Sequence, residues 1–283
     1  MTTYRIRIDY DDSPSSPREN DNLGTMVCWH GRYNLGDEQP KCSPDEYRLG
    51  LTVKYDDTIP EDLSLTREDE LADARRCVRH VISRIRDYHD PYDYKRLAED
   101  WEEYRRCTSP NYRTPQQRVD AILDAKYVIL PLYLYDHSGI TISAVPFSCR
   151  WDSGQVGFIY TSEHAYNKAM MRPAGTPMNA EDTARATRAL LAEVEEYDQY
   201  LTGDVYGFTI ERAVAYEKHR ADGETICGVD WDHDDSCWGF HGPDIHRNGI
   251  LDNIPSFLHA AAKDAMSALG KWFEVEAAAE AAA

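Results

Sequence analysis

The sequence predicts an α+β fold in which a mostly antiparallel sheet packs against helices in a single domain. Two observations support this class. Strand-like and helix-like segments follow one another in blocks (strands, helices, strands, helix, strands, helix) rather than in strict alternation. Turn residues join several consecutive strand-like segments directly, which favours antiparallel pairing. With no clear linker, we expect one domain over residues 1–270; a boundary within 110–126 is the alternative.

The N-terminal part predicts strands. Apolar and polar residues alternate from Tyr4 to Tyr10, as in an amphipathic strand. A polar loop follows, and residues 24–30 (GTMVCWH) predict a second strand. Residues 32–37 form a turn, residues 38–48 are irregular, and residues 49–55 predict a short strand.

Three helices are predicted next. Thr66 is a suitable cap for the first, with Asp69 at the answering position of a capping box, and His89-Asp90-Pro91 ends it. Tyr94, Leu97, Trp101 and Tyr104 form one stripe of the second helix. Pro115 suits the first turn of a third helix that ends near Ala125.

The most apolar and nearly uncharged part of the chain is residues 127–160. Residues 128–135 are rich in β-branched, aromatic and leucine side chains, as in a strand buried on both faces. Turn residues 136–139 and 152–154 separate this strand from strands over 140–143 and 155–160. We expect an antiparallel meander of these three strands at the centre of the sheet.

A long helix is predicted over residues 181–204 after a loop at 170–177. Asn179 caps it, with Asp182 three residues on, and Gly203 ends it. Its expected buried face consists of Leu190, Leu191, Val194, Tyr197 and Leu201.

The C-terminal part predicts a strand over 205–214, then two strands over 226–231 and 237–240. The acidic residues 232–235 form the turn between these two strands. A last helix begins at Ile254 or Pro255. Residues 274–283 (EVEAAAEAAA) form a low-complexity, helix-favouring tail.

The net charge of −19 restricts the possible partners. Residues 221–283 carry 12 acidic and 3 basic residues, whereas the stretch 111–160 is neutral. Such a field disfavours direct binding to nucleic acid or to an anionic membrane and favours a basic protein partner. No apolar run is long enough to span a membrane and no secretory signal is recognisable, so we expect a cytoplasmic protein.

Metal and catalytic motifs are weak. The run Asp230-x-Asp232-x-Asp234 imitates the start of an EF-hand loop but lacks its glycine and its final glutamate. A structural zinc site is the weak alternative to an exposed acidic turn, with the ligands Cys227, Cys237, His241 and His246. Cys28 and His30 share a face of a strand, but their apolar surroundings favour a packed cysteine. We expect no catalytic residue, metal or cofactor.

Acidic runs are the candidate binding residues. Carboxylates three or four residues apart on a helix lie about 5–6 Å from one another, near the spacing of phosphates along a nucleic-acid strand. We expect partner-binding residues on the helix 181–204 and in or beside the acidic turn: Glu193, Glu195, Glu196, Asp198, Asp230, Asp232, Asp234 and Asp235.

Three groups of segments carry a resemblance: residues 21–30 with 32–37, residues 147–160, and residues 195–208 with 235–240. In these scattered blocks the chain resembles a family of uncharacterised proteins of bacteriophages and other mobile elements. The resemblance implies a bacterial cytoplasm and a phage gene. Small acidic phage proteins are often inhibitors of host defence.

We therefore expect a phage-encoded inhibitor of host defence, of the anti-CRISPR or anti-restriction type, rather than an enzyme. Its acidic surfaces would occupy the groove of a basic, nucleic-acid-binding host protein, as a DNA mimic. One alternative is a metal-dependent enzyme acting on nucleotides or nucleic acid. Another is a phage assembly or interaction protein.

Overall fold

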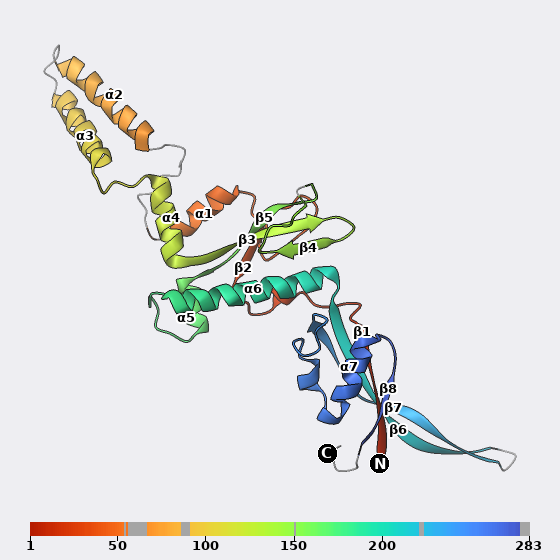
Figure 1. Ribbon diagram of the computed structural model, residues 1–283. Coiled ribbons are helices and arrows are strands. Elements are labelled where there is room, and N and C mark those ends of the chain that lie inside the picture. Colours follow the sequence, from red (N-terminus) through yellow and green to blue (C-terminus); the bar gives the residue numbers. More distant parts are fainter. Residues whose placement is uncertain (54, 56–66, 86–90, 150, 221–223, 278–283) are drawn as a thin grey trace. The chain divides into compact units, whose positions relative to one another are not determined.

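The computed structural model describes residues 1–53, 55, 67–85, 91–149, 151–220 and 224–277. Within these residues the fold is α+β, as the sequence predicts, but its strands form two four-stranded sheets rather than one (Figure 1). Contacts group the chain into two compact units, residues 1–38, 130–159 and 184–283 in one and residues 39–129 and 160–183 in the other. The expectation of one domain stays a prediction. No helix in the described part is long and apolar enough to cross a membrane.

The first sheet has the strand order β7-β6-β1-β8. The strand β1 (Thr2–Tyr10) pairs antiparallel with β6 (Val205–His219) and with β8 (Phe273–Ala277). Its alternation buries Tyr4, Ile6 and Ile8 on one face, which packs against the helix α7 (His259–Ser267) in one core cluster. The opposite face carries Arg5, whose guanidinium lies 4.2 Å from the ring centroids of both Trp231 and Trp272.

The strand β7 (Thr225–His241) corrects the predicted acidic turn. Residues 232–235 lie inside one continuous strand that pairs with β6 from Val205↔His241 to His219↔Thr225. Two register shifts leave Asp234 and Gly239 without a partner on β6. The polar residues and the glycine in this part of β7 therefore form β-bulges within the strand and do not reverse the chain. Gly239 has a φ of 88°, which glycine adopts without the steric cost that other residues incur.

The strand β8 corrects the predicted helical tail. Phe273 and Val275 alternate with glutamates and pair with Ile6 and Tyr4 of β1. The free edge of β1 supplies hydrogen-bond partners there, so tertiary pairing overrides the helix preference of alanine and glutamate. Residues 278–283 of the predicted tail lie outside the described residues.

The second sheet has the order β2-β5-β3-β4, formed by β2 (Thr25–Cys28), β3 (Tyr127–Asp136), β4 (Ile140–Ser143) and β5 (Ser153–Ser162). The hairpin of β3 and β4 is confirmed by its register. The predicted meander is wrong, because β5 pairs with β3 and not with β4. The strongly apolar β3 thereby has a neighbour on each side, as its composition favours.

The long helix α6 (Ala180–Thr202) begins and ends as predicted. The side-chain oxygen of Asn179 accepts hydrogen bonds from the backbone N–H groups of Glu181 and Asp182, and Gly203 follows with a φ of 80°. Leu190 is fully buried near Gly24, where a Cβ atom would overlap the leucine side chain. Leu191, in contrast, is exposed, so its predicted place on the buried face is wrong.

The helix α1 (Pro44–Thr52) replaces the predicted irregular segment and short strand. Ser43 and Glu46 form a capping box and Pro44 occupies the first helical turn, so the helix start was present in the sequence. Leu49 and Leu51 pack against α4 (Pro115–Lys126), which has its own capping box.

Two of the remaining α-helices in the described part of the chain were predicted from the sequence and one was not. The predicted pair is confirmed as α2 (Arg67–Ile85) and α3 (Pro91–Thr108), although Thr66, the proposed cap, lies outside the described residues. The helix α5 (Glu163–Ala169) was not predicted. The 3-10 turns η2 (Ile250–Asn253) and η3 (Ser256–Leu258) precede α7, and η1 (Pro17–Glu19) follows β1.

Candidate protein-binding surface

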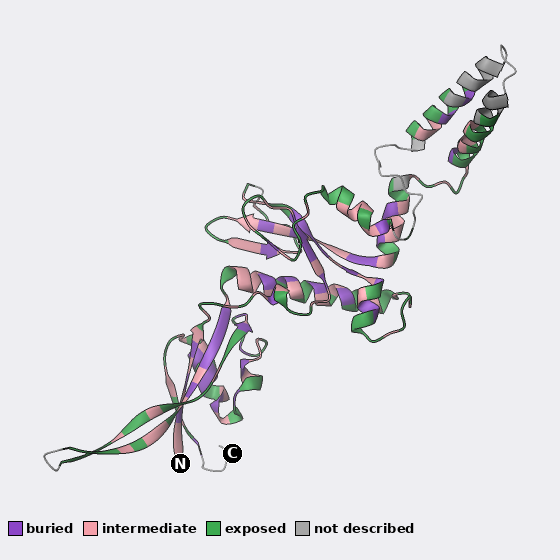
Figure 2. Cartoon of the chain, turned by 180° about the vertical axis from the view of Figure 1, so that it is seen from behind, coloured by how far each residue is buried: buried purple, intermediate pink, exposed green. Residues whose placement is uncertain are grey.

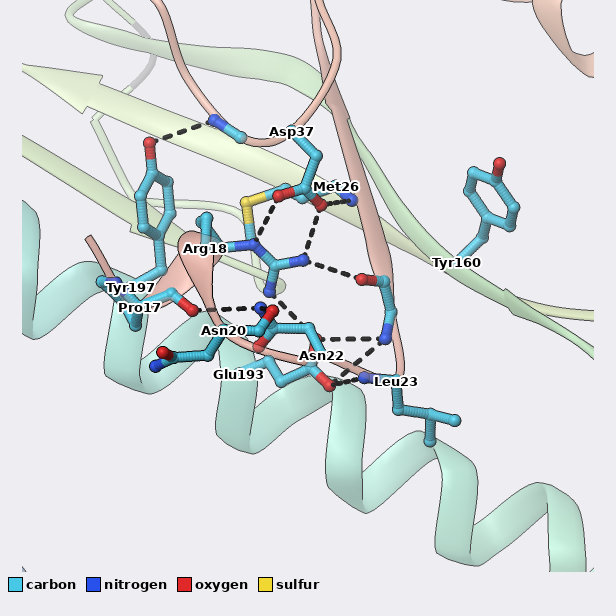
Figure 3. Close-up of polar contacts among 12 residues, drawn as sticks. Pro17, Arg18, Asn20, Asn22, Leu23, Met26, Asp37, Tyr160, Glu193 and Tyr197 are labelled. Carbon is cyan, nitrogen blue, oxygen red and sulfur yellow. Dashed lines mark hydrogen bonds and ion pairs between the residues drawn. The ribbon is translucent and has the colours of Figure 1, made fainter. Parts of the chain in front are cut away.

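A buried arginine connects α6 to the loops around β2 (Figure 3). The Arg18 side chain is 5% exposed, and its guanidinium donates from Nε and Nη2 to the two carboxylate oxygens of Asp37, at 2.9 and 2.6 Å. Nη1 donates to Glu193 of α6 at 2.9 Å, and Nη2 also donates to the Gly24 carbonyl. Arg18 is therefore held by two carboxylates at once.

The two carboxylates also accept backbone hydrogen bonds. Glu193 accepts from the N–H groups of Leu23 and Gly24, and Asp37 accepts from the N–H of Met26. The Glu193 side chain is only 12% exposed. The structure thus places this predicted partner-binding residue inside an internal network, and its acceptor capacity is used within the chain.

The other predicted acids on α6 differ in exposure. Asp198 is half-buried and accepts a hydrogen bond from the Ile142 N–H of β4 at 2.7 Å. Burial raises the pKa of Asp198, although that hydrogen bond acts in the opposite direction. The Glu195 side chain is 55% exposed, and its Oε1 lies 3.6 Å from Nη2 of Arg247, which makes a weak ion pair. Glu196 is half-buried. Of the four predicted acids on α6, Glu195 and Glu196 are the two whose carboxylates are not held by backbone hydrogen bonds in the described structure.

The four predicted aspartates of β7, here called the acidic segment (Asp230, Asp232, Asp234 and Asp235), are all exposed. They lie on the ribbon that β6 and β7 form together, visible as a long hairpin in Figure 1. The pairing of β6 with β1 ends at Arg212, so in the described chain β6 beyond that residue pairs only with β7. Figure 2 shows the outer ribbon largely exposed on both strands.

The register separates the two faces of this ribbon. Asp232 and Asp230 stand opposite Arg212 and Val214, on the same side as Ile210. Trp231 lies on the other side, against Arg5. Asp230, Asp232 and Asp235 therefore share a face that the tryptophan does not occupy, whereas Asp234 is the extra residue of a bulge and has no partner in the register. Arg212 is the one basic side chain directly opposite the acidic segment in the described register.

The four residues considered as zinc ligands do not meet. Cys227 and Cys237 are ten residues apart on a continuous strand, which separates them by roughly 30 Å. His241 ends β7, and His246 lies in the following turn, where its N–H donates to Asp244. Among the described residues, no group of three or more His, Cys, Asp or Glu side chains is arranged to hold a metal ion.

Cys28 and His30 do not form a nucleophile and base. The Cys28 side chain is fully buried, and burial raises the pKa of its thiol to about 12, which leaves it protonated near neutral pH. The His30 Nδ1 accepts from the backbone N–H groups of Arg32 and Tyr33, and its ring stacks on Tyr33. Cys28 is a packed residue, as its apolar neighbours predicted.

Sequence reasoning missed Arg18 and Asp37. No local pattern connects residues 18, 37 and 193, because their meeting depends on how α6 lies against the loops around β2. The only local signal was one arginine within an otherwise polar and acidic loop.

Comparisons with protein-family models, with curated proteins and with solved structures found no match to this chain.

Proposed function

We propose that this chain is a phage-encoded inhibitor of a bacterial defence system, of the anti-CRISPR or anti-restriction type, acting in the host cytoplasm. It binds a basic, nucleic-acid-binding component of that system through acidic surfaces and occupies the groove as a DNA mimic. The observation that carries this proposal is the exposed acidic segment on β7, an edge strand of its sheet.

The charge density of the acidic segment supports this kind of partner. Four carboxylates fall within the six residues 230–235. At about 3.3 Å per residue this is roughly one charge every 5 Å. A single strand of DNA carries one phosphate per about 3.4 Å of axis, so the two densities agree within a factor of two. A groove lined with lysine and arginine would therefore attract this strand.

The geometry favours the ribbon over the middle of α6. Glu193 and Asp198 already accept hydrogen bonds within the chain, so removing them from those partners has a cost that exposed carboxylates do not incur. The acidic segment incurs little of this cost, because the hydrogen bonds that Asp230 and Asp235 accept in the described part of the chain come from the N–H groups of the next residues. We assign the main contact to the ribbon, with Glu195 and Glu196 contributing.

The test is a capture experiment from bacterial lysate with tagged protein, washed over a salt series. We expect a nucleic-acid-binding defence component that salt releases, since exposed charges are screened beyond about 10 Å at 0.1 M ionic strength. Capture should be lost when the four aspartates become lysine. The matched control reverses four exposed acids elsewhere in the same unit, Asp252, Asp264, Glu274 and Glu276.

Capture that survives high salt, or that both variants lose equally, would refute the proposed surface. Recovery of phage assembly proteins alone would favour the alternative of an interaction protein of the phage itself.

A further inference from the structure

A cleft of about 450 Å³ lies between α6 and the turn that follows β7. The helix contributes Ala192, Glu195, Glu196 and Gln199, the end of β7 contributes Gly239 and His241, and the turn contributes Gly242, Pro243, Asp244, Arg247 and Asn248. Both sides belong to the same compact unit. Gly242 donates its N–H to the Asp204 carbonyl and accepts from the Asn248 side chain, so the turn is held in place.

The lining of the cleft has more acidic than basic side chains. Glu195, Glu196 and Asp244 supply carboxylates, and Arg247 is the one basic side chain in the lining. Arg247 lies 3.6 Å from Glu195, and its side chain is 72% exposed, so it neutralises the cleft only weakly. The lining therefore has an excess of negative charge.

His241 adds an unsatisfied polar atom. Its Nδ1 is enclosed and has no hydrogen-bond partner among the described residues. Burial lowers the pKa of His241, while Glu196 and Asp11 act to raise it. The ring is thus mainly neutral at pH 7 and adds no positive charge to the cleft.

We propose that this cleft binds the guanidinium group of one arginine from the basic partner. This inference rests on the proposed function, because such a partner supplies the arginine. A guanidinium presents five N–H donors in a planar fork, which suits several acceptors on different sides of a cleft better than a lysine ammonium does. Ala192 and Pro243 provide apolar surface for the methylene stem.

The experiment titrates the intact protein with N-acetyl-arginine amide at low ionic strength and follows the His241 ring signals by NMR. We expect saturable binding with a Kd of roughly 1 mM, typical of a fragment of this size. N-acetyl-citrulline amide, which has the same shape without the charge, should bind at least roughly tenfold more weakly. Glu196→Gln should weaken arginine binding by a similar factor, and Glu276→Gln, an exposed residue on β8, should leave it unchanged.

Equal binding of the arginine and citrulline probes would overturn the inference, as would wild-type affinity in the Glu196→Gln variant. The result is separable from that of the capture experiment, since the probe needs no partner. Salt-sensitive capture without arginine binding overturns the proposed arginine site and leaves the proposed function in place. Arginine binding without capture overturns the proposed function and supports the proposed arginine site in the cleft.

Discussion

Arg18 shows how much one residue contributes to this structure. Its guanidinium is nearly enclosed and pairs with Asp37 and Glu193, whose remaining lone pairs accept backbone N–H groups. Every charge in the network has a partner of opposite sign or a hydrogen-bond donor. Removing one member leaves the others desolvated without compensation, so such a network is costly to break.

We predict that Arg18→Ala lowers the free energy of unfolding by about 3–5 kcal/mol, because two largely buried carboxylates lose their counter-charge. Urea denaturation of the purified protein measures this change. The Arg18→Lys variant should recover only part of it, since a lysine cannot bind Asp37 in a bidentate manner. A loss below about 1 kcal/mol for alanine would mean that the network is not a stabilising one.

Asp198 gives a prediction with a pH dependence. Burial raises its pKa in the folded state above the unfolded value, so ionised Asp198 opposes folding at neutral pH. This cost disappears as the pH falls through the folded and then the unfolded pKa, where both states bind the proton. Asn at this position can still accept from the Ile142 N–H.

We therefore expect Asp198→Asn to be more stable than the wild type at pH 7, with the difference shrinking toward zero as the pH is lowered to about 3. Denaturation curves at a series of pH values measure it. A variant that is less stable at pH 7, or a difference that grows on acidification, would show that the hydrogen bond to the carboxylate outweighs its desolvation.

Among the elements, local signals predicted the helices better than the sheets. Pro115 located the start of α4, capping residues located α6, and apolar spacing located α2 and α3. The helix α1 was missed although Ser43-Pro44 and Glu46 carry its start signal. The turn in β7 and the helical tail at β8 were wrong for a different reason: both follow local composition, whereas the pairing partner decides the outcome.

The bulges at Asp234 and Gly239 together set the register of β7, and hence the face on which Asp230 and Asp232 lie; Gly239 is the bulge residue with a positive φ. No atom lies within 4 Å of the place where a Cβ would stand, so the cost of a side chain there is conformational. We predict that Gly239→Ala lowers the free energy of unfolding by about 1–2 kcal/mol, the cost of a left-handed conformation for alanine. Thermal denaturation of this variant measures the loss; an unchanged midpoint would mean that the bulge can relax into a regular ladder.

For the whole molecule, the sequence predicted the sign and the location of the charge but not its arrangement. The excess of acid near the C-terminal end was evident from counting. The arrangement of the four aspartates of the acidic segment along one continuous strand was not, since Asp232, Asp234 and Asp235 were expected in an exposed turn. Glu193 looked equivalent to its neighbours in the sequence and is distinguished by contacts with residues far away along the chain, among them Arg18, 175 residues before it, and the N–H groups of Leu23 and Gly24.

The central claim is that the acidic segment takes the place of nucleic acid on a basic partner. The most direct measurement is competition, with a labelled duplex bound to the captured defence component and this protein titrated in. We predict that the wild type displaces the duplex, that displacement weakens roughly tenfold or more as the salt concentration is raised from 50 to 500 mM, and that a variant with all four aspartates changed to asparagine fails to displace it. Simultaneous binding of protein and duplex, or full competition by the four-asparagine variant, would contradict the account.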